Sequence, residues 1–94
     1  MIFDWDPEKN EWLKKERGIS FEDIALLLSA GKLWKTTQHP NRKKYPKQKV
    51  FLVPVDGYVY FVPYVMEGEV IFLKTAFPHR QATRDYLKER KENG

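Results

Sequence analysis

The chain has 94 residues, of which 41% are hydrophobic and 15% aromatic, and it carries a net charge of +4. This length predicts one domain over residues 1–94, because single hydrophobic cores commonly span about 100–150 residues. The absence of cysteine excludes disulfides, thiolate zinc sites and cysteine nucleophiles, and the only two histidines are far apart in the sequence, so we expect no metal site and no cofactor.

The N-terminal segment predicts a cytoplasmic protein. Its first seven residues contain neither a basic region nor an apolar run, so we expect no signal peptide. No run in the chain approaches the roughly 18 apolar residues that a membrane-spanning helix needs, so no membrane is expected among its partners.

A short strand over residues 2–5 is expected to lead into a first helix. Asp6 accepts hydrogen bonds from free N–H groups as a helix cap, and Pro7 at the first helical position lacks only an N–H that would stay unbonded. This helix is expected to run to about residue 17. Gly18 then provides the left-handed residue that ends it.

Ser20 predicts the start of a second helix, with Asp23 at the position that completes a capping box. Gly31 ends this helix. Its apolar residues recur with the helical period and form one face; they are Phe21, Ile24, Ala25, Leu27 and Leu28.

From residue 33 the hydrophobic pattern changes to a period of two, which predicts strands. The expected strands are residues 33–37, 50–55, 58–65 and 70–77. Asp56-Gly57 is a two-residue hairpin signal between the second and third of them, and Glu67-Gly68 predicts the next turn. Residues 38–48 form a basic loop, and residues 81–91 form a closing helix.

Two prolines fall inside these expected strands. Pro54 and Pro63 each remove a backbone donor, so each predicts a sheet edge or a bulge. The element order is a strand, two helices, an antiparallel sheet of about four strands and a C-terminal helix. This order predicts an α+β fold.

The charges are segregated along the chain. Residues 1–31 carry a net charge of −3, whereas residues 32–49 contain seven Lys or Arg and no acid. Residues 74–94 add six bases against three acids. Because a solvated surface usually mixes the two signs, the acid-free block predicts binding to a polyanion.

Both ends of the chain resemble a known family. Residues 3–10 read FDWDPEKN and residues 15–25 read KERGISFEDIA, and together they resemble the opening of the BrnT toxins. Residues 80–86, RQATRDY, are similar to the "R-x-A-T" start of that family's last helix. The match covers about residues 3–25 and 70–90, whereas the middle agrees only in element order.

This resemblance implies a RelE-like fold and the toxin of a type II toxin–antitoxin system. Such toxins are small metal-independent ribonucleases that a cognate antitoxin protein silences. Two departures from the family lie at Arg17, where the family usually has His, and at Phe77-Pro78-His79, which is an insertion in its Ser-Ala-Arg-Arg stretch.

RNA cleavage without a metal requires removal of the 2′-hydroxyl proton, stabilisation of charge on the phosphorane and protonation of the 5′-oxygen. The candidate catalytic residues are Arg80, His79, Arg84, His39 and Tyr86. Arg80 is expected at the start of the last helix, where a guanidinium would meet a phosphate. Arg84 lies four residues on and shares its helical face.

Each of these residues also has an ordinary structural role open to it. Arg80, His79 and His39 could be plain surface residues, Arg84 could pair with a carboxylate such as that of Asp85, and Tyr86 could be a core residue, which is the more common role for a tyrosine in a closing helix.

The basic loop supplies the candidate RNA-binding residues. They are Arg42, Lys43, Lys44, Tyr45 and Lys47. Bases interleaved with an aromatic ring suit phosphate contacts combined with stacking on an unpaired nucleobase, and a merely solvated loop is the alternative.

Other aromatic residues are expected to have mainly structural roles. Tyr58, Tyr60 and Tyr64 alternate on one strand face, which predicts a helix-covered face in preference to a stacking platform. Trp5, Trp12 and Trp34 are expected in the core or against an antitoxin.

The predicted function is therefore a metal-independent RNA endonuclease that acts as a toxin. The expected partners are RNA, which includes ribosome-bound mRNA, and a cognate antitoxin. The alternative is a non-catalytic nucleic-acid-binding or protein-interaction module that retains the fold.

Overall fold

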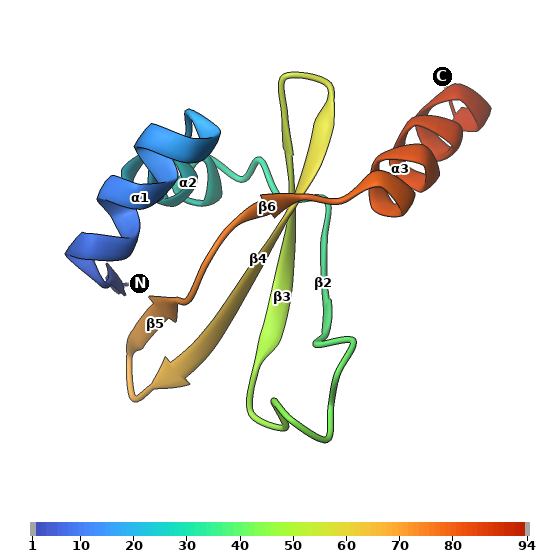
Figure 1. Ribbon diagram of the computed structural model, residues 1–94. Coiled ribbons are helices and arrows are strands. Elements are labelled where there is room, and N and C mark those ends of the chain that lie inside the picture. The colour runs from blue at the N-terminus through green and yellow to red at the C-terminus, as the bar shows by residue number, and fades with distance from the viewer. Residues whose placement is uncertain (1, 94) are drawn as a thin grey trace.

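The computed structural model describes residues 2–93, which form three helices and six strands (Figure 1). In chain order the elements are β1 Ile2–Trp5, α1 Pro7–Arg17, α2 Phe21–Ser29, β2 Lys35–Gln38, β3 Lys49–Val55, β4 Tyr58–Glu67, β5 Val70–Leu73, β6 Phe77–Pro78 and α3 Arg80–Asn93. The predicted α+β class is confirmed.

All the strands belong to one mixed sheet with the order β1-β5-β4-β3-β2, and β6 pairs with β4 beyond the end of β5. The expectation of an antiparallel sheet of about four strands was too simple. β1 joins the sheet by pairing in parallel with β5, with Ile2 opposite Val70 and Trp5 opposite Leu73. The first expected sheet strand after the helices is also displaced, because the ladder between β2 and β3 begins at Lys35 and not at residue 33.

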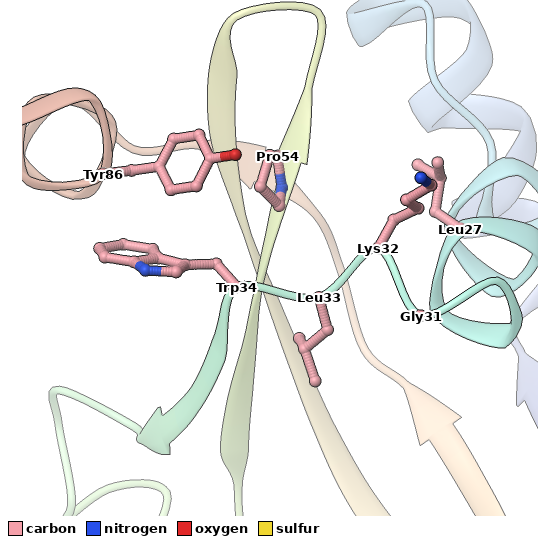
Figure 2. A pocket seen from close by; sticks show the side chains of 7 residues that line it. All are labelled: Leu27, Gly31, Lys32, Leu33, Trp34, Pro54 and Tyr86. Atoms are coloured by element: carbon pink, nitrogen blue, oxygen red, sulfur yellow. The ribbon is translucent and has the colours of Figure 1, made fainter. Parts of the chain in front are cut away.

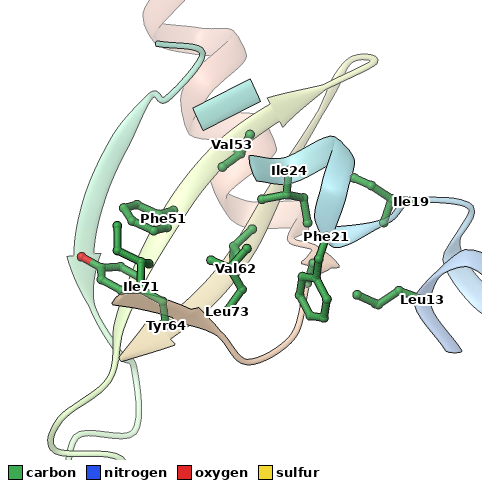
Figure 3. Packing of buried hydrophobic residues seen from close by; sticks show 11 residues of the cluster. Leu13, Ile19, Phe21, Ile24, Phe51, Val53, Val62, Tyr64, Ile71 and Leu73 are labelled. Atoms are coloured by element: carbon green, nitrogen blue, oxygen red, sulfur yellow. The ribbon is translucent and has the colours of Figure 1, made fainter. Parts of the chain in front are cut away.

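Alternate residues of β3 and β4 divide the core between the two faces of the sheet. One cluster of buried side chains packs under α1 and α2, and from β3 and β4 it contains Phe51, Val53, Val62 and Tyr64 (Figure 3). The other cluster contains Val50, Leu52, Val59 and Phe61, together with Ala82 of α3. We call these the α1–α2 face and the α3 face; Figure 1 shows their helices on opposite sides of the strands.

Local signals place the helix ends where the sequence predicted them. The Asp6 side chain accepts a hydrogen bond from the backbone N–H of Glu8, and Pro7 is the first residue of α1. Ser20 and Asp23 form the complete capping box of α2. Gly18 ends α1 with a φ of 66°, a left-handed conformation that glycine adopts without strain.

Asn10 connects the two N-terminal helices from a buried position. Its side-chain oxygen accepts a 2.7 Å hydrogen bond from the backbone N–H of Phe21, and its amide nitrogen donates to the Glu22 carboxylate. The first bond satisfies one of the N–H groups that a helix leaves free at its start. The angle between α1 and α2 is therefore fixed by a polar contact as well as by packing.

The segment expected as one strand over residues 70–77 is interrupted by a bulge. Leu73 lies opposite Tyr64, and Phe77 lies opposite Phe61. Three residues of this segment (74–76) therefore face only two residues of β4 (62–63), and the extra residue reverses which side of the sheet the following side chains occupy. Leu73 belongs to the α1–α2 face, whereas Phe77 packs on the α3 face.

The two strand prolines sit where their missing N–H groups do no harm, as predicted. Pro63 lies opposite the bulge, and its carbonyl accepts a 2.8 Å hydrogen bond from the backbone N–H of Lys74. Pro54 lies on β3 beyond Lys35, where β2 begins, so its nitrogen faces an open edge. One proline marks a bulge and the other an edge.

Candidate nucleic-acid interface

His79 is the capping residue of α3. Its ring nitrogen Nδ1 accepts a 3.1 Å hydrogen bond from the backbone N–H of Ala82, and its carbonyl accepts one from the backbone N–H of Thr83. The imidazole also stacks on the ring of Phe61, with centroids 3.9 Å apart and planes 5° from parallel. With Nδ1 engaged as an acceptor, the neutral ring carries its proton on Nε2, which can donate a hydrogen bond to a ligand.

His79 lines a surface cavity of about 440 Å³ together with Arg80 and Arg84. Tyr58, from the tip of the β3–β4 hairpin, and Thr83 contribute to the same wall, and no lining residue is acidic. The structure therefore brings together three of the five predicted catalytic residues. It also confirms that Arg80 is the first residue of α3 and that Arg84 shares its side of the helix.

Thr83 holds this part of α3 against the sheet, a role that the sequence analysis missed. Its hydroxyl donates a 2.7 Å hydrogen bond to the carbonyl of His79 and accepts a 2.9 Å hydrogen bond from the backbone N–H of Val59. Threonine within the "R-x-A-T" segment was the only available signal, because the second bond depends on which strand lies beneath the helix.

The basic and acidic side chains of α3 form separate stripes. Arg80, Arg84, Lys88 and Lys91 recur at helical spacing on one exposed side, whereas Asp85, Glu89 and Glu92 recur on another. Among the described side chains, the ion pairs within 4 Å are both made by Lys14, on α1. The alternative in which Arg84 pairs with Asp85 is therefore absent here, and the arginines remain available to an anion.

His39 and the basic loop lie around a different cavity. His39 and Tyr45 pack with ring centroids 4.6 Å apart, and both line a cavity of about 360 Å³ near Lys74 and Phe77. The candidate RNA-binding bases Arg42, Lys43, Lys44 and Lys47 are all exposed on this loop. His39 is thus not part of the cluster formed by His79, Arg80 and Arg84.

Tyr86 belongs to a third cavity. Its ring meets that of Trp34 edge-on at 5.2 Å, and Figure 2 shows its hydroxyl directed toward Pro54. The other lining residues come from the end of α2 and the segment before β2. This position favours the packing role for Tyr86 and separates its hydroxyl from the His79 cavity.

The other aromatic residues vary in burial. Tyr64 is buried and stacks on Phe51 with centroids 3.9 Å apart, as expected for a helix-covered face, but Tyr58 at the hairpin tip is 60% exposed. Trp5 stacks on Phe21 within the core. Trp12 is exposed and lies under the cationic groups of Lys9 and Arg17.

Between residues 2 and 93, no helix has the length and apolar character to cross a bilayer. The same residues bring no three His, Asp or Glu side chains together as metal ligands. Models of known protein families, curated proteins and solved structures gave no match to the chain.

Proposed function

We propose that the chain binds single-stranded RNA and cleaves it without a metal, as the toxin of a toxin–antitoxin pair. The observation that carries the proposal is the cavity at the start of α3, where His79, Arg80 and Arg84 meet and no carboxylate is present. Two guanidinium groups beside the free N–H groups of a helix start suit a phosphate diester.

Cleavage proceeds by attack of the 2′-hydroxyl on the adjacent phosphorus. The hydroxyl proton leaves to a base, the new O2′–P bond forms, and the P–O5′ bond breaks as the 5′-oxygen takes up a proton. The products carry a 2′,3′-cyclic phosphate and a 5′-hydroxyl. Arg80 and Arg84 stabilise the charge that grows on the phosphorane, Nε2–H of His79 donates a hydrogen bond to one of its oxygens, and water accepts the first proton and supplies the second.

The charge distribution supports RNA as the substrate. The acid-free block of residues 32–49 forms β2 and the loop after it, and the ring of Tyr45 in this loop lies against the α3 face. The basic stripe of α3 adds charge on the same face. The acidic N-terminal third of the chain covers the opposite face through α1 and α2.

The test compares cleavage and binding in three variants of the whole chain. Arg80→Ala should lower the cleavage rate about 100- to 1000-fold with a smaller loss of RNA affinity, because a cation placed for the phosphorane acts mainly in the transition state. His79→Asn should also slow cleavage, while the Asn side chain still caps the helix. Arg90→Ala is the matched control, since Arg90 stacks on Tyr86 outside the cavity.

Each reaction is run with and without EDTA, and the product ends are identified by mass spectrometry. Cleavage that stops in EDTA, or products with 3′-hydroxyl ends, would contradict the mechanism. Equal cleavage rates for Arg80→Ala and Arg90→Ala would show that the cavity takes no part in the reaction.

A non-catalytic RNA-binding or protein-interaction module is the second candidate, and one observation favours it. The cleavage reaction needs two proton transfers, yet Nδ1 of His79 is engaged in the capping bond, His39 lies in another cavity and Tyr86 packs on Trp34. Binding of RNA without cleavage, with ribosomes present as well as absent, would establish this candidate in place of the enzyme.

The cognate antitoxin is the partner that the toxin proposal requires. An acidic or mixed-charge protein that covers the α3 face would neutralise the basic loop and the α3 stripe together. Expression of the chain alone should arrest bacterial growth, and co-expression of the neighbouring gene product should restore it. A neighbour that neither binds nor restores growth would contradict the pairing.

A further inference from the structure

A second cavity on the α3 face lies between the basic loop and the sheet, with a volume of about 360 Å³. Its main lining residues are His39, Tyr45, Gln48, Pro63, Lys74 and Phe77. The loop contributes an aromatic pair and an amide, whereas the sheet contributes two apolar side chains and an ammonium group. Such a site offers flat apolar walls with hydrogen-bonding groups at their rim.

The loop that forms one wall is ordered by its own hydrogen bonds. The Asn41 backbone N–H donates to Nδ1 of His39 at 3.0 Å, and the Asn41 side-chain oxygen accepts from the backbone N–H of Lys44. The backbone N–H of Tyr45 donates to the Asn41 carbonyl at 2.9 Å. These bonds order the backbone of the loop, and the ring of Tyr45 packs on that of His39, so the entropy cost of binding is lower.

The charge of this cavity selects its ligand. It is lined by Lys74 and His39 and by no carboxylate, and the exposed bases of the loop surround it. By contrast, the cavity beside Arg17 is also lined by Asp23 and Asp56, so it would repel a phosphate. Flat apolar walls combined with a cationic rim fit a nucleotide, with the base inside and its phosphates on the loop.

A row of rings connects this cavity to the one at the start of α3. Phe61 lies between Phe77, at a centroid distance of 5.6 Å, and His79, at 3.9 Å. Phe77 lines the loop cavity and His79 lines the α3 cavity, two residues apart on one short segment. Two residues of extended chain span at most about 7 Å, so one RNA strand can occupy both cavities.

We infer that the cavity between the basic loop and β6 binds a single unpaired base of the RNA strand whose phosphate lies at His79, Arg80 and Arg84. This inference rests on the proposed function and adds base selectivity to it. The base packs between the pair formed by Tyr45 and His39 and the wall formed by Pro63 and Phe77. Gln48 and Lys74 lie where they can contact its polar edge.

His39 thereby becomes a positioning residue and not an acid or base of the reaction. Its Nδ1 accepts from the Asn41 N–H, so the neutral ring carries its proton on Nε2 and can donate a hydrogen bond to a base in the cavity. His39→Ala should change which base is preferred at one position of the RNA, and it should leave the shape of the pH–rate profile as it is.

The experiment measures binding of the whole chain to short 2′-O-methyl oligoribonucleotides, which cannot be cleaved by 2′-hydroxyl attack. Fluorescence anisotropy compares wild type with Tyr45→Ala, Tyr45→Phe and Lys74→Gln, on oligonucleotides with an abasic site moved one position at a time. Tyr45→Ala should weaken binding about 5- to 150-fold, which is the range for loss of one base–aromatic contact, and Tyr45→Phe should retain most of the affinity.

One abasic position should weaken binding to wild type and leave binding to Tyr45→Ala unchanged, because the contact is already lost there. In Lys74→Gln, an abasic site at the same position should weaken binding less than it does in wild type. This substitution leaves the loop itself intact. The salt dependence of Tyr45→Ala should equal that of wild type, since no phosphate contact is removed.

The two levels of the proposal fail in different ways. Wild type could bind RNA with strong salt dependence while no single abasic position weakens binding. This result would contradict binding of a base in the loop cavity, but the RNA-binding function would stand. If wild type binds none of the oligonucleotides, both the proposed function and the binding of a base in the loop cavity are wrong.

Discussion

The guanidinium of Arg17 donates a 2.7 Å hydrogen bond to the carbonyl oxygen of Ala76, which lies 59 residues later in the chain. Ala76 belongs to the three-residue bulge that faces two residues of β4, so its carbonyl is free of a regular ladder partner. The end of α1 therefore fixes the bulge, and the bulge turns Phe77 and His79 onto the α3 face. A residue on one side of the sheet thus determines the position of the candidate site on the other.

Arg17→Ala should lower the free energy of unfolding by about 1–3 kcal/mol. The loss combines a hydrogen bond to a charged donor with the contact between the guanidinium and the Trp12 ring, 4.6 Å from its centroid. Urea unfolding measures the change. Lys15→Ala on the exposed side of α1 should stay within about 0.5 kcal/mol of wild type. Equal stability of the two variants would contradict the role of Arg17.

Glu22 should make a pH-dependent contribution to stability. The hydrogen bond from the Asn10 side chain, with a smaller effect from Lys14, holds the pKa of Glu22 below its usual 4.5. A lowered pKa in the folded state stabilises the fold above the unfolded pKa, and this contribution disappears as the pH falls through the folded value.

The free energy of unfolding of wild type minus that of Glu22→Gln should therefore be constant from about pH 7 to pH 5 and shrink at lower pH. In an Asn10→Ala background the pH-dependent part of this difference should become smaller. An undiminished difference in that background would assign the effect to groups other than Asn10.

His79 should stabilise α3 through its capping bond, independently of any chemistry. His79→Ala should cost about 0.5–2 kcal/mol, because the backbone N–H of Ala82 loses its acceptor. His79→Asn should cost less, since Asn is among the best capping residues, although the stack on Phe61 is lost. Thermal unfolding of both variants measures these losses of stability. If His79→Asn is as unstable as His79→Ala, capping is not the main role of His79.

RNA binding should depend on salt through the loop lysines. Replacing Lys43, Lys44 and Lys47 by Gln should reduce the slope of log affinity against log salt by about 0.7 for each lost contact with a single-stranded phosphate. The matched control replaces Lys9, Lys14 and Lys15 of α1, which removes the same charge from the opposite face. If both triple variants change the slope equally, net charge and not the loop controls binding.

The sequence predicted the features that depend on neighbouring residues. Asp6 with Pro7, and Ser20 with Asp23, cap helices through contacts within three residues, and Asp56-Gly57 forms the expected hairpin with positive φ values of 49° and 87°. Pro54 and Pro63 were placed correctly for the same reason, because a missing N–H constrains the backbone at its own position.

The features that the sequence could not predict depend on distant segments. The parallel pairing of residues 2–5 with β5 has no local signal, and the bulge at residues 74–76 is recognisable only from the register against β4. The same holds for the candidate site. Which cavity receives His39, His79 or Tyr86 depends on the distant segments that pack beside each side chain. For His79, the extra residue in the bulge also determines the side of the sheet.

The parallel pairing of β1 with β5 also determines when the molecule can become complete during synthesis. Ile2–Trp5 leaves the ribosome before its partner, Val70–Leu73, which is made almost 70 residues later. Until then α1 and α2 can form and join through Asn10, yet Phe3 and Trp5 have no strand beside them. The chain therefore folds as a unit only after β5 emerges, since the long loop must close before its contacts stabilise the sheet.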